Sequence, residues 1–299
     1  MQIETVCLAG GGVRAACMLG CLMQFQEGGH LRHVKNLVGT SSGAVVAAAL
    51  ALGKDMREVF DVGVMAFRYE PDVDLDLLDT KFGLDTGKSV DMWIRAVLGD
   101  RGSMLTFRQV LDQFGRSLVV CCTNVTRRKP VYFSAVDHPD MPIGTALRMS
   151  CSIPFLFGCV QHGGELFCDG AVCDNFPLDV ASGLTNSGGE VLGVRYGGSG
   201  GEGRSCSVDT MDAYFKALLE CMVSNQIGGV SSQRGGPDSN PRVTVLKLDA
   251  LSEEVCSVRL DTPKVLLSRL FDAGRRAADE HLATCQKRED GNESTKLAQ

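Results

Sequence analysis

The sequence lacks an excess of basic residues. Its 299 residues contain 30 Lys and Arg against 36 Asp and Glu, which gives a formal net charge of −6. Proteins that bind nucleic acid normally carry a basic face, because they neutralise phosphate groups. The charge balance therefore argues against a nucleic-acid binder, and we expect no nucleic-acid partner.

Long hydrophobic runs are also missing. The longest run of small apolar residues, 44–52, is far shorter than the roughly 20 residues that a membrane-spanning helix needs. The short apolar stretch 6–9 has no basic residue before it, which is not the pattern of a signal peptide. These two absences predict a soluble protein.

The 13 cysteines show no regular spacing. Those that fall within apolar stretches are Cys7, Cys17, Cys21, Cys121, Cys122, Cys159 and Cys168. A free cysteine in such a stretch behaves as a small buried hydrophobe, and an odd, scattered set does not form a disulfide framework. We therefore expect a reducing, cytoplasmic location for this chain.

The first fifty residues alternate between short strands and helices. Residues 5–9 are predicted to form a buried strand, 13–26 a helix and 36–38 a second strand, and an alanine-rich helix follows 39–43. A helix between two strands favours their parallel pairing in one sheet. The predicted fold class is α/β, with a central, mostly parallel sheet covered by helices. Further strands are predicted at 118–123, 131–134, 159–161, 166–168, 191–196 and 243–248, and further helices at 90–98, 107–114, 143–150 and 208–226.

The sequence predicts one domain over 1–285, because it contains no internal repeat and no sharp change of composition. Residues 67–115 are more polar, and we interpret them as a partly helical cap or insertion. Thr262-Pro263 predicts the start of a late helix that ends near residue 285. The tail 286–299 is charged and lacks apolar periodicity, so it is predicted to be disordered.

Two segments match Gly-x-Ser-x-Gly, the pattern of a serine nucleophile on a sharp strand-to-helix turn. The segment 197–201 has no helix behind it and is interpreted as a loop. The other match starts at Gly39 and ends at Gly43, and it joins a predicted strand to a predicted helix, with both glycines making room for crowded backbone. Its Ser41 is the candidate nucleophile, although this motif alone is explained equally well by a serine that caps the helix.

The second motif is Gly10-Gly11-Gly12-Val13-Arg14-Ala15, which fits the Gly-x-Gly-x-x-Ala pattern of dinucleotide-binding folds. Those folds need an acidic residue at the end of the second strand, where this sequence has Gly39-Thr40-Ser41. A glycine run at a helix N-terminus also forms a nest of N–H groups suited to an oxyanion. The sequence favours an oxyanion hole, and Arg14 is compatible with bracing the loop, with binding a substrate phosphate and with a plain surface charge.

The third motif, Asp169-Gly170-Ala171, follows the predicted strand 166–168. An aspartate before glycine at a strand end is most often a turn residue, and its functional use would be as a general base for Ser41. Gly170 removes side-chain bulk where two loops approach each other.

Histidine is scarce, with five in the chain: His30, His33, His138, His162 and His281. In the α/β-hydrolase order of serine, acid and histidine, only His281 follows Asp169, and it lies within the predicted late helix. No histidine has the context of a catalytic triad, so the sequence favours a Ser41–Asp169 dyad.

In order along the chain, these three motifs resemble the signature blocks of the patatin-like phospholipases. The segment 123–134 is similar to the family's paired-strand segment, and 146–154 is similar to the segment that leads to its catalytic aspartate. The segment 174–178 resembles the Asn-x-Pro that follows that aspartate. The resemblance covers about residues 3–282. Ala15 and Ala171 stand where the family often has glycine, and neither change affects the chemistry.

The resemblance implies a lipid acyl hydrolase, of phospholipase A or lysophospholipase type, that needs no metal and no other cofactor. Carried over by position, it makes Ser41 the nucleophile and Asp169 the proton acceptor. The oxyanion hole would be formed by the amides of Gly10, Gly11 and Gly12, with supporting roles for Arg14, Gly39, Gly43, Gly170 and Ala171.

The resemblance also implies an acyl-lipid substrate, either phospholipid or acylglycerol, and peripheral contact with membranes. The net negative charge argues against simple electrostatic attraction to anionic membranes. Two alternatives stay open: a dinucleotide-binding oxidoreductase, and a lipid-binding relative without catalytic activity.

Overall fold

The computed structural model describes residues 2–65, 68–197, 242–248 and 262–296, together with isolated positions between 208 and 221. The strands of its main sheet are β1 (Ile3–Leu8), β2 (Asn36–Thr40), β4 (Ser117–Asn124), β5 (Lys129–Phe133), β7 (Val160–His162), β8 (Glu165–Asp169), β9 (Glu190–Tyr196) and β10 (Arg242–Leu248). They are ordered β10-β9-β1-β2-β4-β8-β7, and β5 pairs with β4. Every strand predicted from the sequence is present, with bounds that differ by one or two residues.

The sheet is parallel over most of its width. Parallel pairs join β10, β9, β1, β2 and β4 in that order, and antiparallel pairs join β4 to β5, β4 to β8 and β8 to β7. All six residues of β1 are buried, as expected for a strand that is covered on both faces. The predicted α/β class with a mostly parallel central sheet is confirmed.

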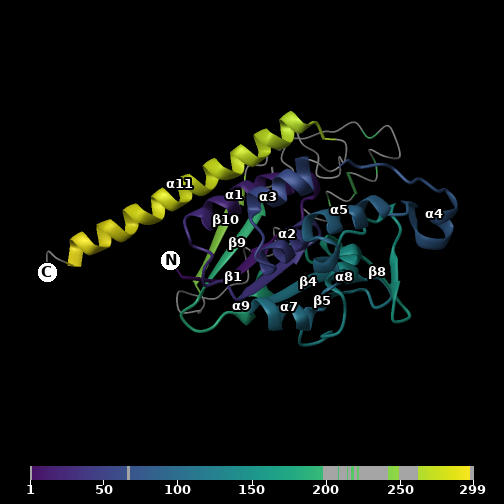
Figure 1. Cartoon of the computed structure of the whole chain (residues 1–299), viewed down its shortest axis with the longest axis horizontal. Coiled ribbons are helices and arrows are strands. Elements are labelled where there is room, and N and C mark those ends of the chain that lie inside the picture. Colours follow the sequence, from purple (N-terminus) through teal and green to yellow (C-terminus); the bar gives the residue numbers. More distant parts are fainter. Residues whose placement is uncertain are drawn as a thin grey trace.

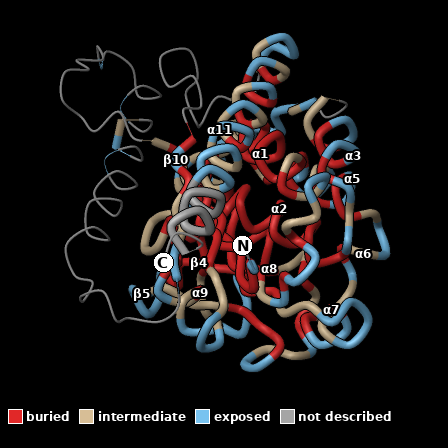
Figure 2. The backbone as a smooth tube through the Cα atoms, turned by 90° about the vertical axis from the view of Figure 1, so that its left-hand side faces the viewer, coloured by how far each residue is buried: buried red, intermediate tan, exposed pale blue. Residues whose placement is uncertain are grey.

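Helices cover both faces of the sheet (Figure 1). The main ones are α1 (Ala15–Glu27), α2 (Ser42–Ala51), α3 (Met56–Phe60), α8 (Ile143–Ser150), α9 (Leu178–Leu184) and α11 (Lys264–Lys296). Side chains alternate along β1, so that Val6 and Leu8 join the larger core with α1 and α2, whereas Cys7 joins the smaller core with α9. The buried strands and the helix faces turned toward them form the centre of the molecule (Figure 2).

Residues 68–115 contain α4 (Asp76–Lys81), α5 (Lys88–Leu98), α6 (Asp100–Met104) and α7 (Phe107–Phe114). Helix α5 packs against α2 and α8, and α7 packs against β4, so these helices extend the layer on one face of the sheet. The three-residue strands β3 (Gly83–Asp85) and β6 (Phe155–Phe157) form a separate parallel pair. The sequence pattern does not predict this pair, next to which α4 lies at the edge of the molecule (Figure 1).

Helix α11 packs along α1, where two glycines allow the backbones to approach closely. A Cβ atom at Gly20 would lie 2.0 Å from the Phe271 carbonyl oxygen, and one at Gly274 would lie 1.8 Å from the Cys17 carbonyl oxygen. The predicted helix end near residue 285 is wrong, because α11 continues to Lys296 through much of the tail predicted to be disordered. Apolar periodicity marks only the part of α11 that packs, and no proline follows Pro263 to end the helix.

Two predictions fall outside the described residues: the loop around Ser199 and most of the helix at 208–226. None of the described helices is both long and apolar enough to span a membrane.

Candidate active site

The strands β2 and β8 meet end to end beside β4. The last residue of β2, Thr40, pairs with Cys121, and the last residue of β8, Asp169, pairs with the adjacent Cys122. Because β2 runs parallel to β4 and β8 runs antiparallel to it, the carboxyl ends of both strands point at the same place. This topology brings Asp169 next to the residue that follows Thr40, which is Ser41.

Ser41 and Asp169 form a direct hydrogen bond. The Ser41 hydroxyl donates to Asp169 Oδ2 over 2.7 Å, and both residues are buried, with 7 % and 3 % of their surface exposed. Asp169 Oδ1 accepts the N–H of Ala171 over 2.8 Å, and the Asp169 N–H donates to the carbonyl of Ser152 over 2.9 Å. The two residues of the predicted dyad are therefore in contact, and the carboxylate is fixed by a backbone donor.

Gly170 fits where the two strand ends meet. A Cβ atom at this position would lie 2.3 Å from the carbonyl oxygen of Cys121 and 2.9 Å from Cγ2 of Thr40. Any larger residue would push β8 away from β2, and the contact between Ser41 and Asp169 depends on that approach. The predicted need for a small residue at Gly170 thus has a specific steric cause.

Ser41 lies on a strained turn between β2 and α2. Its φ is 53° and its ψ is −130°, in a region that residues other than glycine rarely adopt. The neighbouring glycines allow this turn, because a Cβ atom at Gly39 would lie 2.7 Å from the Ala44 amide nitrogen and one at Gly43 would lie 2.5 Å from the Ala9 carbonyl oxygen. The Ser41 side chain makes no capping hydrogen bond to α2, so the alternative of a plain helix cap does not hold.

Ser150 holds the backbone of this turn. Its hydroxyl accepts the N–H of Ser41 over 2.8 Å and donates to the carbonyl of Cys121 over 2.6 Å, and the residue has no exposed surface. Ser150 is a site residue that none of the three sequence motifs contains. Its one signal was its position inside the segment 146–154, which resembles the patatin-like family.

The glycine loop uses two of its three amides within the protein. The N–H of Gly10 donates to the carbonyl of Asn175 over 3.2 Å, and the N–H of Gly11 donates to Oγ of Ser42 over 3.2 Å. Gly12, at φ 55°, makes no hydrogen bond through its N–H to any residue in the described part of the chain. Of the three predicted oxyanion donors, Gly12 is the one whose N–H is available to a ligand.

Arg14 and Tyr196 brace this loop. The Arg14 side chain donates through Nε to the carbonyl of Gly11 over 3.4 Å, and its guanidinium lies 4.6 Å from the centre of the Tyr196 ring. The same ring would lie only 2.0 Å from a Cβ atom at Gly11, so the glycine is required for this contact. Of the three uses predicted for Arg14, the structure supports bracing.

Asn175 joins the glycine loop to the segment after Asp169. Its Nδ2 donates to the carbonyl of Gly10 over 3.2 Å, and a Cβ atom at Gly10 would lie 2.5 Å from its Oδ1. The preceding residue, Asp174, accepts the Thr40 hydroxyl through its carbonyl over 2.9 Å. These contacts hold β1, β2 and the segment after β8 in one fixed arrangement around Ser41.

The burial of Asp169 changes its electrostatics. Removal of the carboxylate from water raises the pKa of Asp169 to about 7, and the hydrogen bonds from Ala171 and Ser41 oppose this rise. A carboxylate with a pKa near neutrality is a better proton acceptor than an ordinary aspartate. No described histidine makes a hydrogen bond to Ser41 or Asp169.

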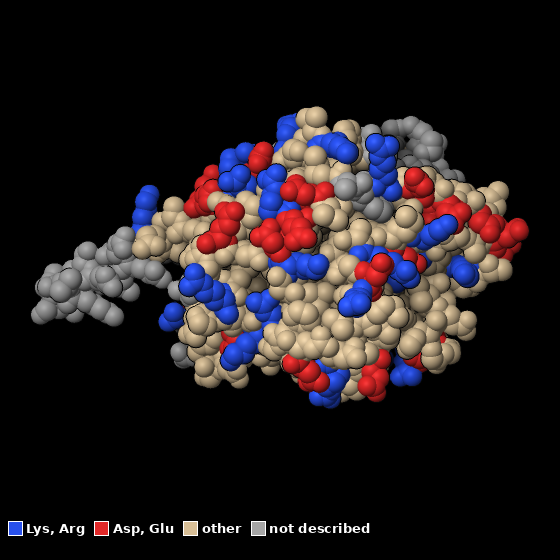
Figure 3. Space-filling model, in the orientation of Figure 1, with Lys and Arg blue, Asp and Glu red and all other residues tan. Residues whose placement is uncertain are grey.

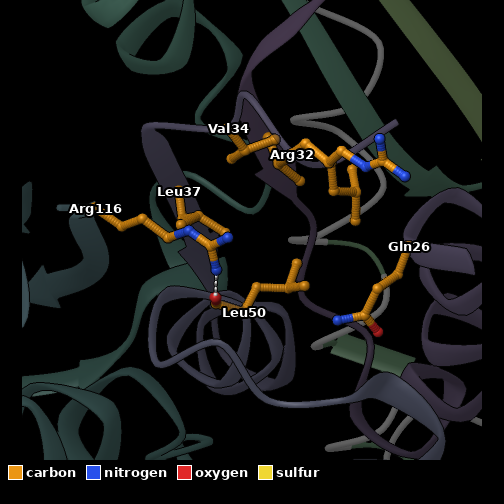
Figure 4. A pocket seen from close by; sticks show the side chains of 8 residues that line it. Gln26, Arg32, Val34, Leu37, Leu50 and Arg116 are labelled. Carbon is orange, nitrogen blue, oxygen red and sulfur yellow. Dashed lines mark hydrogen bonds between the residues drawn. The ribbon is translucent and has the colours of Figure 1, made fainter. Parts of the chain in front are cut away.

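A small pocket of about 130 Å³ lies away from this site, near the carboxyl end of α2 (Figure 4). Its lining residues include Gln26, Arg32, Val34, Leu37, Leu50 and Arg116. The Arg116 guanidinium donates to the carbonyl of Leu50 in the last turn of α2, where a cation is favoured by the helix dipole. Burial lowers the pKa of Arg116. The position of Arg116 in this pocket is explained by its hydrogen bond to the end of α2. The pocket shares no residue with the candidate active site.

Comparison with known proteins identifies a family model that matches this chain. The family model described as Patatin-like phospholipase matches residues 6–182, which include the glycine loop, Ser41 and Asp169. Probable lipid hydrolase 463L from Invertebrate iridescent virus 6 is 28 % identical over 185 residues, which cover 60 % of this chain and 63 % of that protein. YqhO from Bacillus subtilis (strain 168) is 27 % identical over 207 residues, which cover 60 % of this chain and 66 % of that protein. The chain thus spans somewhat less than two thirds of the length of these curated relatives.

Among solved structures, VipD from Legionella pneumophila matches with a TM-score of 0.57 and 16 % sequence identity, over 95 % of this chain and 67 % of that one. At this identity the match establishes a shared fold.

Proposed function

Because the chain belongs to the patatin-like phospholipase family, we propose that it is a lipid acyl hydrolase. It would cleave carboxylic esters of phospholipids or acylglycerols, as a phospholipase A or lysophospholipase. The observation that carries this proposal is the 2.7 Å hydrogen bond between Ser41 and Asp169 where β2 and β8 meet. A hydroxyl paired with a basic carboxylate beside a glycine loop is suited to nucleophilic acyl transfer.

The proposed reaction proceeds through an acyl-enzyme. Asp169 accepts the Ser41 proton while Oγ forms a bond to the ester carbonyl carbon. The N–H of Gly12 faces the oxyanion that develops. When the tetrahedral intermediate collapses, the ester C–O bond breaks and Asp169 returns the proton to the departing alcohol. A water molecule then attacks the acyl carbon while the same carboxylate accepts its proton. The bond between the acyl carbon and Ser41 Oγ breaks, Asp169 returns the proton to Oγ, and the fatty acid leaves.

Product analysis tests this proposal. Purified wild type and Ser41→Ala are incubated with mixed phospholipids and acylglycerols, and the lipids are identified by mass spectrometry. We expect free fatty acid and the matching deacylated lipid from wild type alone. Lipid that binds without turnover would instead favour a non-catalytic relative. A thermal shift caused by NAD or FAD would favour the dinucleotide-binding alternative.

The first prediction concerns pH. Only the ionised form of Asp169 can accept a proton, and its pKa is raised to about 7 by burial. We therefore expect kcat/KM to rise about tenfold per pH unit below neutrality and to level off above it. Hydrolysis of a soluble p-nitrophenyl ester at constant ionic strength measures this profile. A rate that stays constant from about pH 5 to about pH 8 would contradict the assignment of Asp169 as base.

The second prediction concerns Ser150, which we propose as a positioning residue. Ser150→Ala removes the acceptor that holds the Ser41 N–H, so the nucleophile loses part of its alignment. We expect kcat to fall by about 10–10²-fold with little change in KM.

Ser89→Ala is the matched control for this prediction. The buried Ser89 hydroxyl also joins an N–H to a carbonyl, both from Glu70, and it lies in α5 outside the site. Each variant should lose about 1 kcal/mol of stability from the missing hydrogen bonds. Equal kcat values for the two variants would show that Ser150 has a merely structural role.

A further inference from the structure

Helix α4 and the two residues that cap it present large apolar side chains to solvent. Leu75 is the N-cap of α4, Leu78 lies within the helix and Phe82 is its left-handed C-cap, and they are 72 %, 44 % and 50 % exposed. No residue of α4 is buried, so the core does not explain these apolar residues. Large apolar side chains that are exposed together in one short segment are typical of an interaction surface.

Phe82 and Phe155 are held at the surface in an unfavourable conformation. Their φ angles are 59° and 66°, values that bulky residues rarely adopt. The two are close together, because Phe155 pairs with Gly83, the residue after Phe82, in the short β3–β6 sheet. Phe155 is 38 % exposed. Strain of this kind persists where the position of a side chain matters for function. We refer to Leu75, Leu78, Phe82 and Phe155 as the α4 patch.

The α4 patch is connected to the scaffold of the candidate active site. Arg148, in α8, donates to the carbonyl of Thr86 over 2.9 Å, directly after β3. Phe155 follows Ser152 by three residues, and the Ser152 carbonyl accepts the N–H of Asp169. Three residues of extended chain span at most about 10 Å. A surface that engages the α4 patch would therefore lie near the end of β8, where Asp169 meets Ser41.

The charges around the patch indicate what kind of surface this is. Four exposed aspartates lie in the same segment: Asp72, Asp74, Asp76 and Asp79. Figure 3 shows acidic side chains at the end of the molecule where α4 lies. Proteins that bind anionic lipids use clusters of Lys and Arg, which α4 lacks except for Lys81. The exposed apolar side chains can bind an apolar surface, and the aspartates beside them would repel a negatively charged one. The α4 patch therefore suits a partner surface that carries no net charge.

We propose that the α4 patch docks the protein on a zwitterionic lipid membrane, with Leu75, Leu78, Phe82 and Phe155 inserted at the level of the headgroups. This inference rests on the proposed function, because it supplies the acyl-lipid substrate to Ser41. The apolar side chains provide the binding energy, and the aspartates disfavour anionic membranes.

Vesicle co-sedimentation tests this proposal in the full-length Ser41→Ala background, which leaves the lipid intact. The test variant carries Leu75→Gln, Leu78→Gln and Phe82→Asn, since asparagine tolerates positive φ. We expect it to bind phosphatidylcholine vesicles about 10²-fold more weakly than its parent. Phosphatidylserine added to the vesicles should weaken the binding of the parent.

The control variant carries Val136→Gln and Val265→Gln, which replace apolar side chains that are 85 % and 74 % exposed elsewhere on the surface. Its binding should equal that of the parent. Equal binding by the test variant, or stronger binding to phosphatidylserine, would overturn the proposal. So would a change of mass in analytical ultracentrifugation with unchanged vesicle binding, because the patch would then cover a second copy of the chain.

Turnover separates this proposal from the proposed function. With Ser41 intact, the three α4 substitutions should leave hydrolysis of a soluble short-chain ester unchanged and lower hydrolysis of vesicle lipid. If the unmodified protein hydrolyses neither substrate, the proposed function fails, whereas the binding experiment still decides whether the patch docks on lipid.

Discussion

Ser41→Ala is expected to lower ester hydrolysis by about 10⁴-fold or more, because no other group replaces the attacking oxygen. The protein should stay folded, since the Ser41 hydroxyl contacts the Asp169 carboxylate and does not cap α2. The measurements are kcat/KM on a soluble ester and the thermal unfolding midpoint. Ser199→Ala, in the second Gly-x-Ser-x-Gly match, should have wild-type activity.

Ser41→Gly distinguishes the loss of the nucleophile from backbone strain. Glycine adopts the positive φ of this position without steric penalty, so Ser41→Gly should be more stable than Ser41→Ala by about 1 kcal/mol. Both variants should be equally inactive. Wild-type activity in either would show that Ser41 is not the nucleophile.

Asp169→Asn should separate activity from stability. The amide cannot accept the Ser41 proton, so we expect kcat to fall by about 10²–10⁴-fold. Asparagine keeps Oδ1, which can accept the N–H of Ala171, and its Nδ2 can donate to the Ser41 hydroxyl. The substitution also removes a carboxylate whose ionisation is opposed by burial. The variant should therefore be more stable than wild type at neutral pH.

The expected gain in stability of Asp169→Asn follows from the coupling between proton binding and folding. The folded-state pKa of Asp169, about 7, lies above that of an unfolded chain, about 4. Between these values the folded state keeps a proton that the unfolded state has lost, so this group lowers stability as pH rises. The gain in Asp169→Asn should reach about 1–3 kcal/mol above pH 7 and vanish below about pH 4. Denaturant unfolding across this range measures it, and a loss of stability at pH 8 would contradict the account.

The pairing of Ser41 with Asp169 could be predicted because local signals mark both positions. Each lies at or directly after the carboxyl end of a short apolar strand, with a glycine one or two positions away. The strand order could not be predicted, because the residues within and around each strand carry no signal that β8 meets β2 beside β4. Ser150 was missed for the same reason, because it contacts Ser41 from 109 positions away.

Two features, the free amide of the glycine loop and the exposed side chains around α4, could not be predicted because they depend on contacts between residues distant in the sequence. The motif indicated three possible oxyanion donors, but Ser42 and Asn175 occupy the amides of Gly11 and Gly10. The polar composition of 67–115 indicated a cap. It gave no sign that α4 would leave Leu75 and Phe82 exposed, because that depends on how the short sheet of β3 and β6 packs.

The central claim is that Asp169 activates Ser41 as a nucleophile, and labelling with a fluorophosphonate probe tests it most directly. Such a probe forms a covalent bond with an activated serine, and peptide mass spectrometry locates the adduct. We predict that wild type is labelled at Ser41, that Ser41→Ala is not labelled and that Asp169→Asn reacts far more slowly. An adduct on another serine, or wild-type lipid hydrolysis by Ser41→Ala, would contradict the account.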